Sequence, residues 1–277
     1  MEICATAVEI ETGSRPHGRR ATIEAAFSSQ SVANLFGTTI GARVLLQFRE
    51  ANDTTAGWTS RATVPDFEAH DRVGLDAMES LDFLPPGGEA AHAKRSDKGE
   101  TVQAARFAKQ YQIDEQDLIG DRLGLLATTP QAMGRAAGRL TPDLVYGLLL
   151  ANPTMARTGR AAFHTDDGTL LTAAAFGKES LSLAIASLMK QKDGDATLNL
   201  NPTHLITGAE LADKVVQLTG SAIFTNDSGA GARNPLARYG ITPVADARIS
   251  NGVVHPKTKV LQTGSTTAWF LISTDGD

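Results

Sequence analysis

Residues 129–152 read TPQAMGRAAGRLTPDLVYGLLLAN, and this stretch decides the fold. Its apolar residues recur at steps of three and four, which places them on one side of a helix. They are Met133, Ala137, Leu140, Leu144, Leu148 and Ala151. We therefore predict a long helix with this apolar stripe buried. At a rise of 1.5 Å per residue it would span roughly 33 Å, enough for other elements to pack along it.

The same stretch contains two candidate N-termini of a helix. Thr129 precedes Pro130 and Thr141 precedes Pro142, and each pair is typical of an N-cap followed by a proline at the first helical position. The second pair predicts a break or a kink near Pro142. Gly138 keeps a bent but continuous helix open as the alternative, because it removes bulk where the proline ring would crowd the preceding turn.

Composition limits the classes of protein to consider. The chain has 277 residues, 42% of them hydrophobic, which suffices for one large domain or two modest ones. Its net charge of -5 gives no general attraction to DNA. Cys4 is the single cysteine, so an intrachain disulfide is excluded, and no Cys/His spacing fits a structural zinc. No apolar run could span a bilayer and residues 1–10 lack a signal-peptide pattern, which favours a cytoplasmic origin.

The N-terminal part of the chain predicts an arm, short helices and a hairpin. Residues 1–31 predict an arm, and residues 32–50 predict one or two short helices. Residues 58–100 combine sparse apolar positions with nine acidic residues around a turn at Pro85–Gly88, which predicts a hairpin. Such a hairpin cannot stabilise itself, so we expect it to lie against something else, such as another copy of the chain. Residues 101–113 alternate and predict a half-covered strand.

The C-terminal part predicts a layer of helices and strands, an α+β arrangement. A loop-rich crossing over residues 153–172 follows the long helix. The predicted helices are Leu181–Lys190 and Ala209–Leu218, the second with Leu211, Val215 and Leu218 inward. The predicted strands are His204–Thr207, Ile241–Ile249 and Ala268–Ser273.

Motifs that carry chemistry are scarce. His164, Asp166 and Asp167 form the densest cluster of candidate metal ligands, but a polar loop beside Gly168 accounts for the same residues. Gly177-Lys178 lacks the earlier glycine and the following hydroxyl residue of a phosphate-binding loop. The chain also lacks the Gly-x-Ser-x-Gly, His-Glu-x-x-His and dinucleotide-binding motifs. We predict no catalytic, cofactor-binding or metal-binding residues, no cofactor, and a protein that is not an enzyme.

In order and spacing, several segments resemble the major head subunit (gpT) family of phage Mu and Mu-like prophages. The resemblance covers about residues 30–273. Its segments are Val64–Phe67, Leu81–Glu89, Asp114–Arg122, Gly134–Ala137, Asp143–Pro153, Gly159–Thr172 and Asn201–Leu218.

The resemblance implies the HK-97-like fold of tailed-phage major capsid proteins. It assigns residues 1–57 to an N-terminal arm with short helices, 58–100 to an extended loop, 101–194 to a peripheral domain with a spine helix at 129–152, 195–265 to an axial domain, and 266–277 to a return strand toward the peripheral domain. It also implies that further C-terminal strands of the family are missing. Without them, the strand predicted at 101–113 would expose an unpaired edge.

The function implied is a structural subunit that self-assembles into the icosahedral shell around a dsDNA genome. Its partners would be copies of itself in pentamers and hexamers. Scaffold, protease, portal and decoration proteins are further expected partners. Contact with DNA would be weak and non-specific, and no contact with membranes is expected. The protein would belong to the virion and assemble in the bacterial cytoplasm. Two alternatives stay open: a phage hydrolase, such as a prohead protease or lysis enzyme, and a non-catalytic scaffold or adaptor of the particle.

Overall fold

The computed structural model describes residues 41–73, 99–110, 125–156, 158–171, 175–193, 196–221, 223–225 and 231–274. The chain divides into two compact units. The first unit consists of Met1–Asp53 and Arg106–Pro142, and the second of Thr54–Ala105 and Asp143–Asp277. Each unit is described by itself below.

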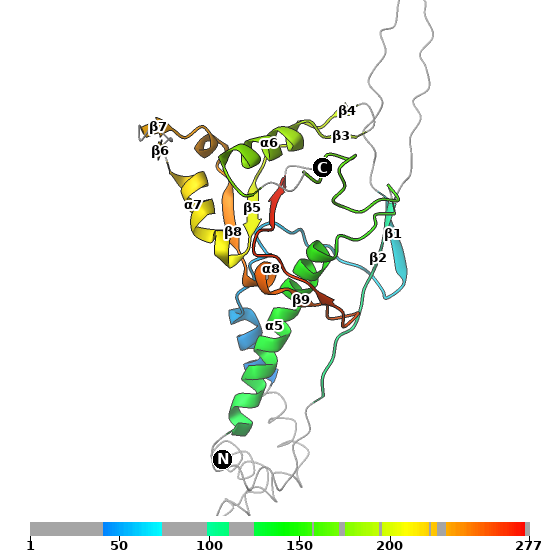
Figure 1. Ribbon diagram of the computed structural model, residues 1–277. Coiled ribbons are helices and arrows are strands. Elements are labelled where there is room, and N and C mark those ends of the chain that lie inside the picture. The colour runs from blue at the N-terminus through cyan, green and yellow to red at the C-terminus, as the bar shows by residue number, and fades with distance from the viewer. Residues whose placement is uncertain are drawn as a thin grey trace, which may run out of the picture. The chain divides into compact units, whose positions relative to one another are not determined.

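The second unit is built on a mixed three-stranded sheet with the order β11-β5-β8 (Figure 1). The central strand β5 (His204–Thr207) pairs antiparallel with β11 (Trp269–Ile272) and parallel with β8 (Thr242–Ala245). The strands predicted at His204–Thr207 and Ala268–Ser273 are therefore confirmed, the first residue for residue. Together with the helices this gives an α+β fold, as predicted.

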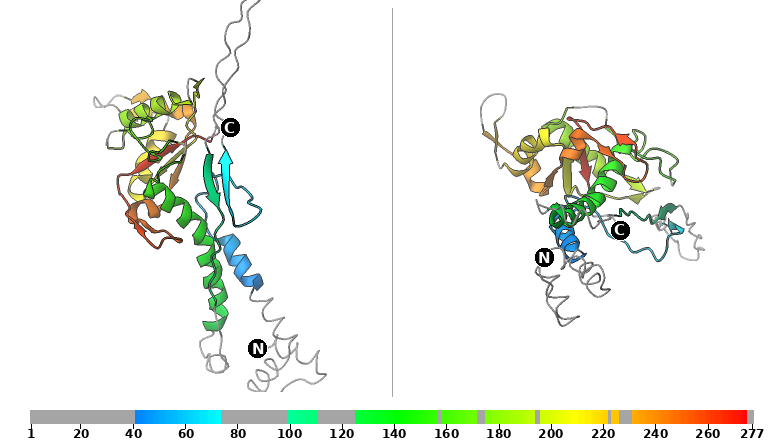
Figure 2. Two further views of the ribbon diagram at one scale, coloured as in Figure 1. Left: turned by 90° about the vertical axis from the view of Figure 1, so that its right-hand side faces the viewer. Right: turned by 90° about the horizontal axis from the view of Figure 1, so that it is seen from below.

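Helices cover both faces of this sheet because neighbouring residues of β5 point to opposite sides. Leu205 packs in a cluster with residues of α6 (Lys178–Met189) and α7 (Ala212–Gly220). Ile206 packs in a second cluster with Tyr146 of α5 and Ile249 of α8 (Ala247–Asn251). Figures 1 and 2 show the strands between these helices. The central strand β5 is thus buried on both sides.

The other elements of the second unit are short. The 3-10 turns are η1 (Ala209–Leu211) and η2 (Leu236–Tyr239). The two-stranded ladders pair β3 (Lys192–Asp193) with β4 (Ala196–Thr197), β6 (Ile223–Thr225) with β7 (Gly231–Arg233), β9 (Val253–Val254) with β10 (Leu261–Gln262), and β1 (Ala69–Val73) with β2 (Gly99–Gln103).

The ladder of β1 and β2 corrects the prediction for residues 101–113. Asp71 lies opposite Thr101, and the threonine hydroxyl donates a 2.9 Å hydrogen bond to the carboxylate. The strand ends at Gln103, residues 104–110 have no regular structure, and residues 111–113 lie outside the described part. β1 pairs with one edge of β2, and among the described residues no strand pairs with its other edge. The turn predicted at Pro85–Gly88 lies outside the described residues.

The long helix is confirmed, but its ends and its buried face differ from the prediction. Helix α5 runs from Leu125 to Ala151 and continues through both Pro130 and Pro142. Neither Thr129 nor Thr141 is therefore an N-cap, and the alternative of a continuous helix at Pro142 holds. The buried row consists of Pro130, Gly134, Gly138, Pro142 and Tyr146, spaced by four residues.

The apolar stripe predicted to be buried is largely outside that row. Leu148 is 56% exposed, and Ala137 and Ala151 are also exposed. Met133, Leu140 and Leu144 are half-buried. Other segments of the chain approach the helix closely along this row. Small or compact residues such as glycine and proline therefore occupy it, whatever their hydrophobicity.

Within the first unit, a helix over residues 41–50 packs closely on α5. A Cβ atom on Gly134 would lie 2.5 Å from the carbonyl oxygen of Val44, and one on Gly138 would lie 2.2 Å from Cβ of Ala51. Arg135 donates a 3.2 Å hydrogen bond to the side chain of Gln47. The two glycines therefore let the helices approach more closely than any larger residue allows.

Two further predictions need correction. The strand predicted at Ile241–Ile249 is only β8, because Asp246 caps the start of α8 by accepting a 2.9 Å hydrogen bond from the backbone N–H of Arg248. The helix predicted at Ala209–Leu218 begins as η1 and continues as α7 to Gly220. Its inward residues are as expected, since Val215 is buried in the core.

Candidate functional site

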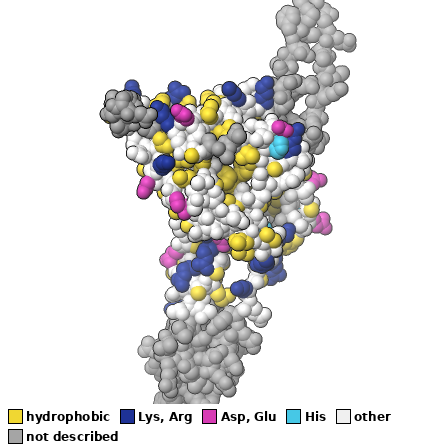
Figure 3. Space-filling view, in the orientation of Figure 1, with side chains coloured by type: hydrophobic (Ala, Val, Ile, Leu, Met, Phe, Trp, Pro, Cys, Tyr) yellow, Lys and Arg dark blue, Asp and Glu magenta, His cyan; other side chains and the backbone are white. Residues whose placement is uncertain are grey.

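Large apolar side chains lie at the surface of both units. Among the described residues, sixteen are exposed, whereas twelve hydrophobic residues form the buried core. On the face shown in Figure 3, hydrophobic side chains lie at the surface among polar ones. Scattered exposed hydrophobic residues are normal, so their placement decides whether they matter.

On two elements of the second unit, an exposed valine directly follows a buried one. In α7, Val215 is 1% exposed and its neighbour Val216 is 57% exposed. In β9, Val253 is 6% exposed and Val254 is 54% exposed. Each element therefore places an exposed valine directly next to a buried one, and an exposed aliphatic side chain on an ordered element is a candidate contact with a partner.

These residues belong to two separate surfaces. The α7 surface consists of Glu210, Asp213, Val216 and Ile223, all exposed. The hairpin surface consists of Val254, Lys257, Lys259, Val260 and Leu261, also exposed. In Figure 1, α7 and β6 lie on the left of the second unit and β9 lies on its right.

Backbone hydrogen bonds hold the hairpin surface in a defined shape. The N–H of His255 donates to the carbonyl of Val260, and the N–H of Lys259 donates to the carbonyl of His255, each at 2.9 Å. The hairpin also lies on α5, since a Cβ atom on Gly147 would be 3.1 Å from the ring of His255. Its exposed side chains are thus presented on an ordered support.

A partly buried polar network connects three segments of the second unit. The hydroxyl of Thr54 donates a 2.6 Å hydrogen bond to Asp246 and lies 2.9 Å from the hydroxyl of Tyr146. The guanidinium of Arg248 donates to Asp246 at 3.1 Å and to Asp143 at 2.6 Å. The network therefore joins the turn after Thr54, the C-terminal half of α5 and α8.

The electrostatics of this network suit a structural role. Burial raises the pKa of Tyr146 to about 12, so its phenol keeps its proton at neutral pH. Burial alone would lower the pKa of Arg248, but the hydrogen bond to Asp143 and the charge of Asp246 raise it overall. The guanidinium thus stays charged and compensates the buried carboxylate of Asp246, which is 7% exposed.

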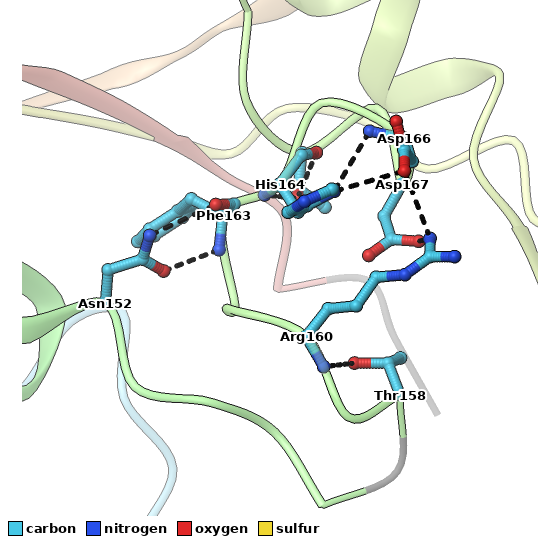
Figure 4. Close-up of polar contacts among 8 residues, drawn as sticks. Asn152, Thr158, Arg160, Phe163, His164, Asp166 and Asp167 are labelled. Atoms are coloured by element: carbon cyan, nitrogen blue, oxygen red, sulfur yellow. Dashed lines mark hydrogen bonds and ion pairs between the residues drawn. The ribbon is translucent and has the colours of Figure 1, made fainter.

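The candidate metal ligands lie together in the loop after α5, but they pair with an arginine (Figure 4). Arg160 lies 2.9 Å from Oδ1 of Asp167 and 3.8 Å from Oδ2 of Asp166. Nδ1 of His164 accepts a 3.2 Å hydrogen bond from the backbone N–H of Asp166. Within the part of the chain that the structure describes, no three His, Cys, Asp or Glu side chains are grouped to hold a metal ion.

Asn152 organises this loop and was missed by the sequence reasoning. Its φ of 45° is left-handed, and its side-chain amide both donates to the carbonyl of Phe163, at 3.1 Å, and accepts from its N–H, at 2.7 Å. The available signal was an asparagine directly after a helix, since asparagine tolerates this conformation at helix ends. Figure 4 shows the amide facing the backbone of Phe163.

The comparison with known families decides how these surfaces are interpreted. A family model described as phage capsid protein matches residues 99–277, more than half of the chain. The chain belongs to this family. Neither curated proteins nor solved structures gave a match. The match includes α5 and the C-terminal part of the second unit, with both apolar surfaces.

Membership of the phage capsid family assigns a structural role in the virion, as the sequence predicted at this coarser level. Among the described residues, no helix has both the length and the apolar character of a transmembrane span. In a capsid protein, exposed apolar side chains on ordered elements are natural contacts between subunits. The two surfaces are accordingly the candidate functional site of this capsid protein.

Proposed function

We propose that this chain is the structural subunit of a phage head and that its copies assemble into the icosahedral shell enclosing a dsDNA genome. Membership of the phage capsid family supports the general role. The observation that carries the assembly is the exposed valine beside a buried one on two ordered elements, Val216 beside Val215 and Val254 beside Val253. Burying one such side chain at a contact contributes about 1.5–3 kcal/mol.

Repetition makes such modest contacts sufficient. Each subunit of a shell uses the same surfaces against several neighbours, and closed symmetry multiplies their contribution. In this proposal the partners of each subunit are other copies of the chain, arranged in pentamers and hexamers. Scaffold, protease, portal and decoration proteins are further partners, and contact with DNA is weak because the net charge is -5. Assembly takes place in the bacterial cytoplasm.

The finer proposal is an HK-97-like fold of the Mu-like head subunit family. Residues 1–57 would form the N-terminal arm, 58–100 the extended loop, 101–194 the peripheral domain with its spine helix, and 195–265 the axial domain. Two observations support it: the antiparallel ladder that joins the ends of segment 74–98, and the 27-residue helix α5. Residues 266–277 would return toward the peripheral domain, and β11 within them shares its sheet with β5.

Assembly is tested directly with the purified full chain. We expect light scattering after gel filtration to detect pentamers, hexamers or larger particles, and electron microscopy to show shells. The variant Val216→Asp should lose particles while it keeps its circular dichroism spectrum. Its matched control is Lys214→Asp on the same helix, which should assemble normally. A wild-type chain that stays monomeric at every concentration would contradict the proposal.

The extended loop has its own test. Replacing Leu81 and Phe83 by Ala should lower the yield of particles and leave the urea midpoint of the unassembled chain unchanged, because the proposal places their contacts on a neighbouring subunit. Equal damage to folding and to assembly would reject this role.

We propose further that the chain has no catalytic activity. Probes that label serine or cysteine nucleophiles should leave it unmodified, and labelling of one specific residue would favour the hydrolase alternative. A chain that joins particles only together with another shell protein would favour the scaffold alternative.

A further inference from the structure

We propose that, within a ring of capsid subunits, the hairpin surface of one copy binds the α7 surface of the next. This inference rests on the proposed function, since it names the surfaces through which neighbouring subunits meet. The occupant of each surface is therefore a second copy of the chain, contacted in a head-to-tail manner.

Charge is the first argument. The hairpin, residues 253–262, contains Lys257 and Lys259 and has no acidic residue in its sequence. The α7 surface contains Glu210 and Asp213, and both side chains are exposed. They lie three residues apart where η1 continues into α7, which places them on neighbouring positions of the turn. The two surfaces are therefore complementary in charge.

The positive charge of Lys214 on α7 does not face the proposed contact. Lys214 is exposed on the same helix, two positions before Val216. Two residues subtend about 200° around a helix, so the lysine lies on the side away from the valine. Asp213 precedes Val216 by three positions and lies on the same side. The exposed valine is thus flanked by carboxylate rather than by ammonium.

Apolar contact is the second argument. Val254, Val260 and Leu261 of the hairpin are 54–60% exposed, and Val216 and Ile223 of the α7 surface are 57% and 67% exposed. The hairpin thus offers aliphatic side chains bordered by ammonium groups, and the α7 surface offers Val216 beside the carboxylate of Asp213. Ile223 lies opposite the exposed Arg233 in the β6–β7 ladder. An interface with an apolar centre and a charged rim is the usual arrangement between proteins, and the charges fix its register.

Charge favours a head-to-tail contact over a two-fold contact in which each surface meets its own copy. Such a two-fold contact would oppose lysines to lysines or carboxylates to carboxylates, which is repulsive. A head-to-tail contact joins two different surfaces, which lie apart on the second unit in Figure 1. Contacts of this type close into rings when the rotation allows it. Capsid pentamers and hexamers are such rings.

Charge reversal tests the pairing. The hairpin variant Lys257→Glu/Lys259→Glu and the α7 variant Glu210→Lys/Asp213→Lys should each require about tenfold or more higher protein concentration to assemble, because like charges then face each other. A chain carrying all four substitutions restores complementarity and should assemble near the wild-type concentration. Particle yield is measured by sedimentation and electron microscopy, and folding of each variant by circular dichroism.

Matched controls change the net charge by the same amount elsewhere on the second unit. Lys190→Glu/Lys192→Glu corresponds to the hairpin variant, and Asp166→Lys/Glu179→Lys corresponds to the α7 variant; all four side chains are exposed. Both controls should assemble like the wild type. Loss of assembly in the controls to the same extent would show that net charge alone acts, and would overturn the pairing.

Mixing the two single-surface variants gives a sharper readout. In a 1:1 mixture each copy finds complementary surfaces on the other variant, so alternating rings form. Alternation closes only in rings with an even number of subunits, and we expect hexamers without pentamers.

The remaining outcomes separate the two proposals. If the wild type forms shells and both single-surface variants do as well, the pairing is wrong while the capsid function stands. If the variants fail and the fourfold variant does not recover, the two surfaces do not bind each other. If the wild type itself never assembles, the proposed function fails.

Discussion

Thr54 donates a 2.6 Å hydrogen bond to Oδ2 of Asp246, although 192 positions separate the two residues in the chain. The same hydroxyl oxygen lies 2.9 Å from the hydroxyl of Tyr146, which therefore serves as the donor of the second bond. One small side chain thus connects the start of the second unit to α5 and α8. Its removal should affect the whole unit.

We predict that Thr54→Val lowers the free energy of unfolding by about 1.5–3 kcal/mol, because the hydrogen bond it removes ends on a charged acceptor. The control is Thr59→Val, whose hydroxyl donates only to the backbone carbonyl of Thr55 at 2.8 Å, and which should cost about 0.5–1.5 kcal/mol. Urea titration of the unassembled chain measures both. Equal losses would mean that the link to Asp246 adds nothing.

Tyr146 should make stability fall at high pH. Folding raises its pKa from 10.0 to about 12, so the folded chain holds the phenol proton more tightly than the unfolded chain. This contribution is fully present below pH 10 and is lost as the pH rises toward 12. The urea midpoint of the wild type should decline over this interval more steeply than that of Tyr146→Phe. Parallel declines would show that the phenol is not responsible.

Gly134 should tolerate no side chain. A Cβ atom there would meet the backbone oxygen of Val44 at 2.5 Å, so Gly134→Ala must displace the helix over residues 41–50. We expect a net loss of about 1–3 kcal/mol from overpacking, despite the better helix propensity of alanine. Hydrogen exchange of residues 41–50 should accelerate. Ala136→Ser, on an exposed position of α5, is the control and should leave the exchange unchanged.

Leu148 should matter more for assembly than for folding. Because its side chain is 56% exposed, Leu148→Ala should cost less than about 1 kcal/mol, well below the 2–5 kcal/mol typical of a buried leucine. The yield of particles should nevertheless fall if this part of α5 contacts a neighbour. An unfolding free energy reduced by several kcal/mol would show that the side chain is buried in the folded chain.

Asn152 offers a test of the loop after α5. Asn152→Ala removes two hydrogen bonds to Phe163 and places a Cβ-bearing residue without a compensating amide at φ 45°, so we expect a loss of about 2–4 kcal/mol. Asn152→Gly removes the same bonds without the backbone strain and should lose about 1–2 kcal/mol less. Limited trypsin digestion within residues 155–171 should follow the same order.

The local periodicity of the sequence determined which segments become helices and strands. The strand His204–Thr207, the inward Val215 and the long helix all follow from repeats of two or of three and four residues, and such repeats depend only on neighbours in the chain. The charge pattern of His164, Asp166 and Asp167 likewise indicated a polar loop, but not its partner Arg160.

Only the tertiary structure decided which face of α5 is buried. The hydrophobic pattern selected the stripe with Leu144 and Leu148, whereas the buried row contains Gly134, Gly138 and Tyr146. Glycine and proline are buried where another segment of the chain packs against the helix backbone. The hydrophobic pattern of the helix sequence does not indicate where that packing occurs. The bond between Thr54 and Asp246 is hidden for the same reason, since its two ends meet only when the chain is folded.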